Sequence, residues 1–399
     1  MLLCTTISIA QTTRFVKPAA TGTGDGSSWA NASNDLQAMI DAATDQVFVA
    51  VGTYKPNRRA DATGMITPND RDNAFVLRTN IKIYGGFDPD NGIDDLSDTR
   101  IIPTSAGTGN GSILSGDLGA QNDTTGNVYH VVASIGNVGT GRLDGFTIKD
   151  GNATGDGSIP INGISTVSRN GGGGINSRES SPTFANLIIS DNYSLNGGGG
   201  MSCPTNASPT LINVLFSKNV TQDRGGGLMN TMNSSPVLIN VTFSENSVAR
   251  NAGSTGSIRG GGLYNGTDSS PTLINVTFIR NSAVGTATNV RGGGIYNFSN
   301  SSPTLTNVVF TENTAPNGGA MHNESSSPTL TNTTISRNSA TTGGAIFNRG
   351  SSFPKLYNTI IWDNTATTNP GINNINTSAP DIQFSLVQGI DNSANGGLD

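Results

Sequence analysis

The chain has 399 residues, of which 52 are glycine, and carries a formal net charge of −6. Only 13% of the residues are Asp, Glu, Lys or Arg, against roughly 25% in ordinary globular domains, which excludes a basic nucleic-acid-binding protein. Two histidines and two cysteines are too few for a usual zinc cluster, and no apolar run reaches the ~20 residues that span a bilayer.

The N-terminus, MLLCTTISIAQTT, is apolar and ends in the small-residue segment Ser8-Ile9-Ala10. This pattern is typical of a secretory signal, although a basic leader is missing and an ordinary first strand is the alternative. We therefore interpret residues 1–11 as the remnant of a signal peptide, and we expect the protein to be secreted or on a bacterial cell surface. Cleavage would leave Cys203 as the one cysteine, which excludes an intrachain disulfide framework.

Residues 12–46 are predicted to form an N-terminal cap. A short amphipathic helix at Asp35–Ala43, with Asn34 as its N-cap, would close the end of a solenoid. Residues 47–170 are then expected to form irregular coils. Their predicted strands are Val47–Val51, Gly52–Tyr54, Ile81–Tyr84 and Phe146–Ile148.

Residues 171–399 carry an internal repeat. Seven prolines mark it, with gaps of 27, 27, 35, 32, 25 and 26 residues: Pro182, Pro209, Pro236, Pro271, Pro303, Pro328 and Pro354. Four residues after each proline stands one asparagine: Asn186, Asn213, Asn240, Asn275, Asn307, Asn332 and Asn358. Ten residues after each proline stands another: Asn192, Asn219, Asn246, Asn281, Asn313, Asn338 and Asn364. A third series follows the glycine runs: Asn230, Asn265, Asn297, Asn323 and Asn348, preceded by Ser177 and Cys203.

Short strands in a ~26-residue repeat cannot bury a face alone. Stacked about 4.8 Å apart, they predict a right-handed parallel β-helix, an all-β solenoid of three sheets with three strands per repeat. Buried asparagines at the corners would bond to their counterparts in neighbouring coils. An apolar column of phenylalanines is expected inside: Phe216, Phe243, Phe278 and Phe310, flanked by Ile189, Ile335 and Ile361. The repeat reaches the last residues without a cap, so we expect the solenoid to continue beyond Asp399.

Two sets of motifs resemble known families. Gly343-Gly-Ala-Ile346 and the Phe-x-x-Asn motifs that begin at the four phenylalanines are similar to the repeats of chlamydial polymorphic outer-membrane proteins. That resemblance implies a β-helical adhesin displayed on the cell surface. The opening segment resembles secreted β-helix proteins of the pectin-lyase-like superfamily, in these motifs: Trp29, Gly52-Thr-Tyr54-Lys-Pro56, Tyr84-Gly-Gly-Phe87 and Leu114-Ser-Gly-Asp117. Because that superfamily includes lyases, hydrolases and adhesins, the resemblance implies a fold rather than an activity.

Two outward stripes follow from the repeat. The residue before the second asparagine alternates in charge: Asp191, Lys218, Glu245, Arg280, Glu312, Arg337 and Asp363. Opposite charges on neighbouring strands stabilise a sheet face, so we interpret this stripe as structural. Strand alternation predicts a second stripe that faces outward and includes aromatic rings: Met229, Tyr264, Tyr296, His322 and Phe347.

The aromatic stripe is the predicted ligand-binding groove, because rings at strand spacing suit successive sugar units. Arg224, Arg259 and Arg291 lie just upstream, and the insertions at about residues 248–258 and 283–290 could form its walls. Alternatively, the loops cover the rings, and Asp223 or loop carboxylates neutralise the arginines.

Candidates for catalysis and metal binding are few. Asp268 and Glu324 follow the aromatic strand two coils apart, roughly 9–10 Å, near the upper end of the carboxylate separation of an inverting glycosidase. Asp88, Asp90 and Asp94 lie in an acidic segment that resembles a calcium loop but departs from the EF-hand spacing. The alternative for both sets is a solvated surface carboxylate, and we expect no cofactor other than a possible Ca²⁺.

Regular, weakly charged repeats without an evident acid/base cluster favour an adhesin-like or glycan-binding module. Its expected partner is a polysaccharide or a host or cell-surface glycan, with no nucleic acid and no membrane span, and we expect a monomer. The alternatives are a polysaccharide lyase or glycoside hydrolase that acts on the aromatic face, and a structural spacer.

Overall fold

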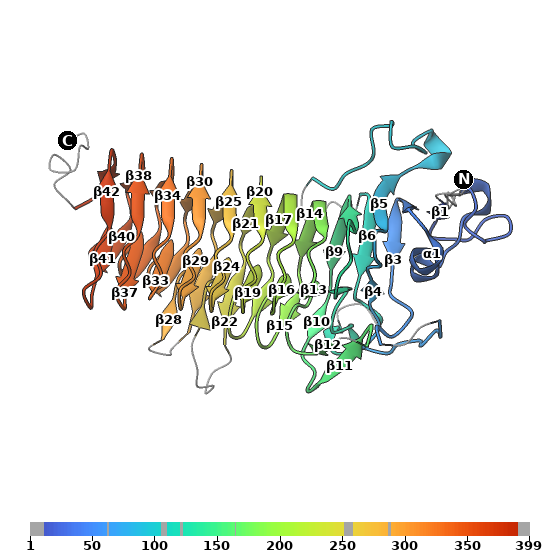
Figure 1. Cartoon of the computed structure of the whole chain (residues 1–399), viewed down its shortest axis with the longest axis horizontal. Coiled ribbons are helices and arrows are strands. Elements are labelled where there is room, and N and C mark those ends of the chain that lie inside the picture. Colours follow the sequence, from blue (N-terminus) through green and yellow to red (C-terminus); the bar gives the residue numbers. More distant parts are fainter. Residues whose placement is uncertain are drawn as a thin grey trace, which may run out of the picture.

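The computed structural model describes residues 12–61, 64–104, 110–119, 123–163, 165–250, 258–285 and 289–389. Parallel strands stack coil upon coil from β1 (Thr13–Val16) at one end to β42 (Asp381–Gln383) at the other (Figure 1). The predicted signal remnant, residues 1–11, lies outside the described residues. Among the described residues, three short 3₁₀ helices lie in the N-terminal part of the chain: η1 (Trp29–Asn31), η2 (Pro89–Asn91) and η3 (Thr124–Gly126).

The first sheet is the largest and takes two strands from most coils. Its early strands are β1, β2 (Gln46–Ala50), β3 (Gly52–Tyr54), β5 (Lys82–Phe87), β6 (Ser112–Ser115), β8 (Arg142–Asp144), β9 (Phe146–Lys149), β14 (Thr183–Ser190) and β17 (Thr210–Ser217). Its later strands are β20 (Val237–Ile239), β21 (Thr242–Ser244), β25 (Thr272–Ile274), β26 (Thr277–Ile279), β30 (Thr304–Thr306), β31 (Val309–Thr311), β34 (Thr329–Thr331), β35 (Thr334–Ser336), β38 (Lys355–Tyr357), β39 (Ile360–Trp362), β42 and β43 (Leu386–Val387).

Two further parallel sheets close the coil. The second sheet contains β4 (Phe75–Val76), β7 (Val132–Ile135), β13 (Ile175–Arg178), β16 (Met201–Cys203), β19 (Leu228–Thr231), β24 (Leu263–Gly266), β29 (Ile295–Phe298), β33 (Met321–Glu324), β37 (Ile346–Arg349) and β41 (Ile372–Asn374). The third contains β10 (Asn152–Ala153), β15 (Tyr193–Ser194), β18 (Val220–Thr221), β22 (Ser247–Ala249), β23 (Ile258–Arg259), β27 (Ser282–Val284), β28 (Val290–Arg291), β32 (Thr314–Asn317), β36 (Ser339–Thr342) and β40 (Thr365–Thr368). An antiparallel hairpin, β11 (Ser158–Ile161) and β12 (Ser165–Ser168), projects from the early coils.

These sheets confirm the predicted parallel β-helix, and its parallel crossovers have the expected right-handed sense. The prediction of three strands per repeat was wrong, because a regular coil contains four, as in β24 to β27. The missed strand, here Ser282–Val284, directly follows the buried Asn281 and is only three residues long. It carries no aromatic residue that would mark it in the sequence.

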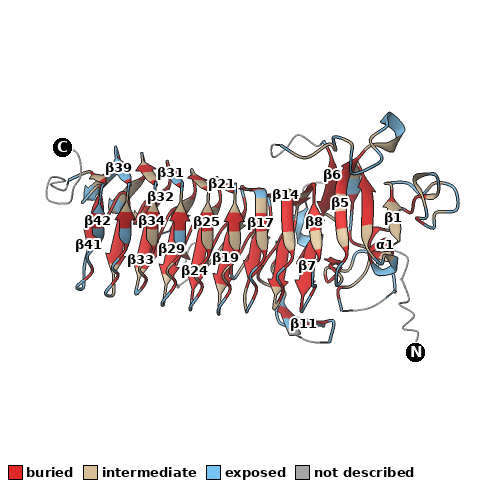
Figure 2. Ribbon diagram, turned by 45° about the horizontal axis from the view of Figure 1, so that its top comes forward, coloured by how far each residue is buried: buried red, intermediate tan, exposed pale blue. Residues whose placement is uncertain are grey.

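The interior contains the predicted apolar column. The rings of Phe216, Phe243, Phe278 and Phe310 are fully buried and stack 4.8, 4.7 and 4.8 Å apart, with interplanar angles of 3°, 0° and 5°. Ile189, Ile335 and Ile361 continue the column in register. Successive coils therefore stack with almost no rotation, and the buried residues form a continuous core (Figure 2). Untwisted sheets of this kind depend on stacked side-chain ladders.

The second asparagine series forms the predicted buried ladder. From Asn192 to Asn364, each side-chain amide Nδ2 donates to the Oδ1 of the next asparagine over 2.9–3.0 Å. Each backbone N–H donates to that same Oδ1, as Asn281 N–H does to Asn313 over 3.0 Å. The third series, from Asn230 to Asn348, is also buried and bonded over 2.8–2.9 Å. Its last member, Asn348, donates to the exposed Asn374 over 2.8 Å. Cys203 and Asn230 lie in register, as predicted.

The first asparagine series lies on the surface, so its predicted burial was wrong. Asn213 to Asn358 are exposed, and they bond to one another over 3.1–3.3 Å. These residues have positive φ, as Asn275 does at 55°, and they form the bend between paired strands of the first sheet. The left-handed backbone that the sequence predicted for the corners is therefore present, with the side chain directed to water.

The cap forms at the predicted position. Helix α1 (Leu36–Ala42) packs on β1 and β2, and its N-cap is Asp35, whose carboxylate accepts the Ala38 N–H over 3.0 Å. The prediction of Asn34 as the N-cap was therefore wrong by one residue. The region assigned to the cap also holds the first strand of the solenoid, because β1 pairs in parallel with β2.

Candidate functional site

The predicted aromatic groove is not open to solvent. Tyr264 is 3% exposed, Tyr296 0%, His322 1%, and Met229 and Phe347 7%. The residues do form the predicted column, since Tyr264, Tyr296, His322 and Phe347 lie on successive coils in register. The rings stack on one another 4.7–5.7 Å apart. Strand alternation placed them outside the phenylalanine core, but other side chains cover them there.

The arginine column provides part of that cover. The guanidinium of Arg259 lies 5.4 Å from the ring centre of Tyr296, and that of Arg224 lies 5.7 Å from Tyr264. Arg291 pairs with Glu324 over 2.7 Å. Asp223 pairs with Arg224 over 2.9 Å and with Arg250 over 3.2 Å, as the alternative interpretation of a covered stripe anticipated. The central parts of the two insertions, residues 251–257 and 286–288, lie outside the described residues.

The two carboxylates predicted as a catalytic pair have different environments. Asp268 is exposed at a turn with φ of 59°, and its N–H donates to the Ser299 carbonyl. Glu324 is largely buried and accepts hydrogen bonds from the Tyr296 hydroxyl over 2.6 Å and from Arg291. Through these two bonds Glu324 fixes the Tyr296 ring in the column. Arg349 also lies 3.7 Å from Glu324, so the structure gives this carboxylate a structural role between two arginines and the Tyr296 hydroxyl.

His322 makes the stability of the ring column dependent on pH. Burial, and then the neighbouring Arg291 and Arg349, hold the pKa of His322 well below its usual range. The unfolded chain binds a proton at about pH 6.5, whereas the native imidazole stays neutral. Stability is therefore lost as pH falls below that value, by up to about 1.4 kcal/mol per pH unit.

We expect His322→Phe to reduce this loss, because phenylalanine fits the stack between Tyr296 and Phe347 and does not titrate. The measurement is the denaturant midpoint between pH 7 and 5, a range above most carboxylate titration. The remaining dependence of the midpoint on pH should come mainly from the second histidine, His130, because burial lowers its pKa as well. Identical pH profiles for the variant and the natural chain would contradict this prediction.

The acidic segment predicted to bind calcium is arranged as a salt-bridged turn. Asp90 pairs with Lys17 over 2.8 Å, and Asp88 accepts the side-chain amide of Asn91 over 2.8 Å. The backbone carbonyl of Asp94 accepts the indole N–H of Trp29. In the described part of the chain, no three Asp, Glu, His or Cys side chains converge as a metal would need. Calcium binding there stays a prediction that this arrangement does not favour.

A cavity of about 520 Å³ lies between the early irregular coils and the first regular one. We call it the Tyr193 hollow, and its lining residues are Arg71, Thr124, Thr125, Asn127, Asp150, Gly151, Asn152, Thr154, Asp191 and Tyr193. Tyr193 is half-buried on β15, and its hydroxyl accepts the Gln222 amide over 2.6 Å. The hollow thus combines one ring with hydroxyl, amide and carboxylate groups, which is the mixture that small polar ligands require.

Arg71 shapes this hollow from a distant segment. Its guanidinium donates to the carbonyls of Asn127 and Asn152 over 2.8 and 2.9 Å and to the Thr154 hydroxyl over 2.8 Å. It also lies 4.3 Å from the ring centre of Tyr129. Arg71 therefore joins three segments of the early coils, and one of its faces lines the hollow.

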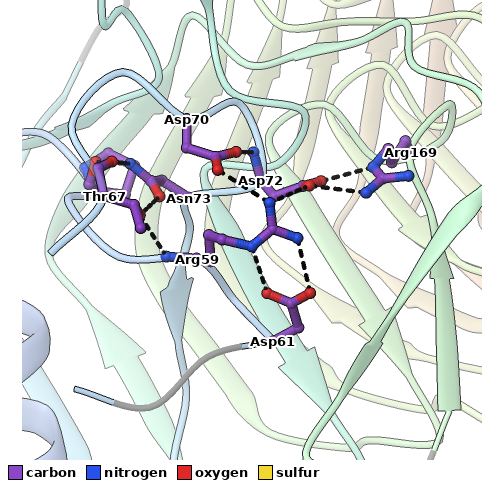
Figure 3. Close-up of polar contacts among 8 residues, drawn as sticks. Arg59, Asp61, Thr67, Asp70, Asp72, Asn73 and Arg169 are labelled. Carbon is purple, nitrogen blue, oxygen red and sulfur yellow. Dashed lines mark hydrogen bonds and ion pairs between the residues drawn. The ribbon is translucent and has the colours of Figure 1, made fainter. Parts of the chain in front are cut away.

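A second cavity of about 560 Å³ shares Arg71 with the first. We call it the Tyr129 hollow, and it is lined by Pro68, Asn69, Asp70, Arg71, Asp72, Tyr129, Asp156 and Arg169. An ion-pair network fixes its wall (Figure 3). Arg59 donates two hydrogen bonds to the Asp61 carboxylate, over 2.8 and 2.9 Å, and contacts Asp70 and Asp72 at 3.0 Å. Arg169, which follows the hairpin in the chain, donates two hydrogen bonds to the Asp72 carboxylate over 2.7 and 2.8 Å.

None of the residues around the two hollows was predicted from the sequence as a ligand-binding residue. They come from segments that do not repeat, and contacts such as Arg71 to Asn152 join positions 81 residues apart. The sequence contains one feature that could have indicated the first hollow. Asp150 precedes Asp191 in the charge stripe, and two acidic residues in succession break the alternation of sign. Lys149 pairs with Ser190 in the sheet, which places Asp150 beside Asp191 on adjacent coils.

No protein-family model and no curated protein matches the sequence. Several solved structures are similar in shape. A tailspike protein of the Acinetobacter baumannii bacteriophage Fri1, a capsular polysaccharide depolymerase, is 14% identical over 89% of this chain and 60% of that chain, with a TM-score of 0.35. PfbA, a surface adhesin of Streptococcus pneumoniae, is 12% identical over 92% of both chains, with a TM-score of 0.36.

The A-module of the mannuronan C-5 epimerase AlgE6 of Azotobacter vinelandii is 14% identical over 88% of this chain and 93% of that chain, with a TM-score of 0.30. The present chain thus spans 60% of the length of the tailspike chain. At these values the likenesses concern the fold alone. None of the three is a chlamydial polymorphic outer-membrane protein, so that resemblance stays an expectation.

Proposed function

We propose that the protein is a glycan-binding β-helix, secreted or displayed on the cell surface, that holds a polysaccharide in the Tyr193 hollow. The observation that carries this proposal is a cavity of ligand size whose wall combines the half-buried Tyr193 ring with the hydrogen-bonding groups of Asn127, Asp150 and Asp191. A sugar offers an apolar ring face and a rim of hydroxyls, and this wall matches both.

The surroundings support a preformed site. Arg71 ties three segments around the hollow, and the network of Arg59 and Arg169 fixes the wall of the adjoining Tyr129 hollow. Because both cavities share Arg71, a chain longer than one sugar unit could extend from the first into the second. A fixed site loses little conformational freedom when it binds, which favours affinity. In the described part of the chain, no helix is long and apolar enough to cross a membrane.

The test applies the full chain to immobilised neutral, acidic and amine-bearing polysaccharides and scores retained protein and new chain ends in the same wells. We expect retention without new chain ends, and Tyr193→Ala should weaken retention by about tenfold because an aromatic anchor is lost. Tyr357→Ala is the matched control, since Tyr357 is also half-buried but lies on β38, far along the solenoid.

Each other outcome would replace the proposal. New chain ends that depend on Asp150 or Asp191 would make the protein a polysaccharide-cleaving enzyme. Equal losses in Tyr193→Ala and Tyr357→Ala would place the binding surface elsewhere. No retention on any polysaccharide would favour a structural spacer.

A further inference from the structure

The column of charged residues along the solenoid stops alternating in sign at the Tyr193 hollow. From Asp191 to Asp363 the sign alternates at every coil, and Arg280 contacts Glu245 over 3.0 Å and Glu312 over 3.6 Å. Asp150 and Asp191, at the start of this fully described column, are its one adjacent pair of like charges. Both have positive φ, 64° and 56°, so they occupy equivalent turns. Like charges at neighbouring strand positions destabilise a sheet.

No described residue that lines the hollow forms an ion pair with Asp150 or Asp191. Asp150 contacts Lys149 over 3.3 Å and accepts the Ser115 hydroxyl over 2.9 Å. Asp191 is exposed and makes no ion pair among the described residues. Arg71 is the one cation in the lining, and its guanidinium donors are directed to carbonyls, to Thr154 and over the Tyr129 ring. Asp150 is thus paired by Lys149, which lies outside the lining, whereas Asp191 adds to the wall of the cavity a carboxylate without an ion pair in the described part of the chain.

A buried acceptor in the same wall lacks a donor. Asn127 is 3% exposed, and its side-chain amide donates to the Asp150 carbonyl over 2.8 Å. Its Oδ1 atom is buried and has no hydrogen-bond partner. A buried polar atom without a partner is costly, so such an atom in the wall of a cavity indicates a missing donor.

We infer that the Tyr193 hollow selects a protonated amino sugar, such as a glucosamine unit of a polysaccharide. An ammonium group carries three donors and one positive charge, which suits Asp150, Asp191 and the Asn127 oxygen. The sugar ring packs on Tyr193, where a cation also gains from the aromatic face. This inference rests on the proposed function and names the ligand class of the same site.

The experiment titrates the full chain with a glucosamine oligosaccharide and with its N-acetylated form, which has the same length and linkage. Binding is measured by calorimetry at a pH where the free amine is protonated. We expect the N-acetylated form to bind about tenfold more weakly, because it lacks the charge and two of the donors. Asp191→Asn should weaken binding of the free amine about fivefold, the upper range for a solvent-accessible pair, and leave the N-acetylated form unchanged.

Asp363→Asn is the matched control, because Asp363 occupies the equivalent turn of the same column with φ of 57°. It should leave both affinities unchanged. Equal affinities for the two oligosaccharides, with both lost in Tyr193→Ala, would overturn the amine preference and leave the glycan site intact. Binding of calcium chloride alone that Asp191→Asn removes would identify a metal site instead. No binding of any sugar would overturn both proposals.

Discussion

Asn281→Leu should destabilise the solenoid by about 3–5 kcal/mol, because it removes a buried amide that serves two neighbouring coils. The Oδ1 atom of Asn281 accepts both the backbone N–H and the side-chain Nδ2 of Asn246, over 3.1 and 3.0 Å. Its Nδ2 donates to the Phe243 carbonyl over 2.8 Å and to Asn313 over 3.0 Å. Leucine has a similar volume but leaves these groups without partners, at about 1–3 kcal/mol for each buried one.

Asn275→Leu is the matched control within the same coil. Asn275 also belongs to an asparagine ladder, with bonds of 3.1 Å to Asn240 and Asn307, but it is exposed, so water replaces those bonds. The remaining cost is that of a leucine in left-handed backbone, about 1–2 kcal/mol.

Thermal unfolding compares the two variants, and hydrogen exchange locates the loss, which should concentrate in the coils that contain residues 246, 281 and 313 because a solenoid is stabilised between neighbours. Equal destabilisation by the two substitutions would show that burial does not set the strength of the ladder.

The contrast between Asn275 and Asn281 shows what the repeat could predict. The proline spacing gave the register correctly, because residues that stack must recur once per coil, and the phenylalanine column followed from it. Spacing alone cannot tell which asparagine faces the core, since both recur equally well. The difference lies in the backbone: the exposed series has positive φ and the buried series does not.

The aromatic column illustrates a second limit. Alternation correctly separated Tyr264 and Tyr296 from Leu263 and Ile295, since the tyrosines form a cluster of their own outside the main core that holds the other two. It could not show that Arg259 and Glu324 reach those rings, because the covering side chains belong to other coils. Solvent access is a property of the packed solenoid, whereas alternation is a property of one strand.

The Tyr193 hollow was not predicted because part of its lining comes from outside the repeat. The Tyr193 hollow forms where regular and irregular coils meet, and the non-repeating segments supply Arg71 and Asn127. Residues that occur once, such as Arg71 and Asn127, leave no periodic pattern in the sequence. The charge column was predicted to begin at Asp191, and the pairing of Lys149 with Ser190 is what places Asp150 beside it at the hollow.

Gly261→Ala should cost about 3 kcal/mol, at the upper end for overpacking, because the space for a methyl group is occupied by backbone. A Cβ at Gly261 would lie 2.4 Å from the Gly293 carbonyl oxygen and 2.5 Å from that of Ser282. Both oxygens belong to strands and turns that are bonded to neighbouring coils, as in the 3.0 Å bond from the Gly261 N–H to Gly292. Relief of the Gly293 contact therefore requires two coils to separate, and relief of the Ser282 contact requires the coil of Gly261 itself to widen.

The adjacent glycine provides the control. A Cβ at Gly262 would lie 2.8 Å from the Gly294 carbonyl oxygen and 3.0 Å from the ring of Phe278. The equivalent position two coils further along is Ala320, in the coil where Ile335 replaces the phenylalanine of the core column. We expect Gly262→Ala to cost less than Gly261→Ala, about 1–2 kcal/mol, because one of its two closest contacts is the edge of a ring that can shift, whereas the contacts at Gly261 are all with backbone. Midpoints of thermal unfolding measured side by side test the difference. If both alanines are tolerated, the coils can separate locally, and the close approach of the glycine turns does not set the coil spacing.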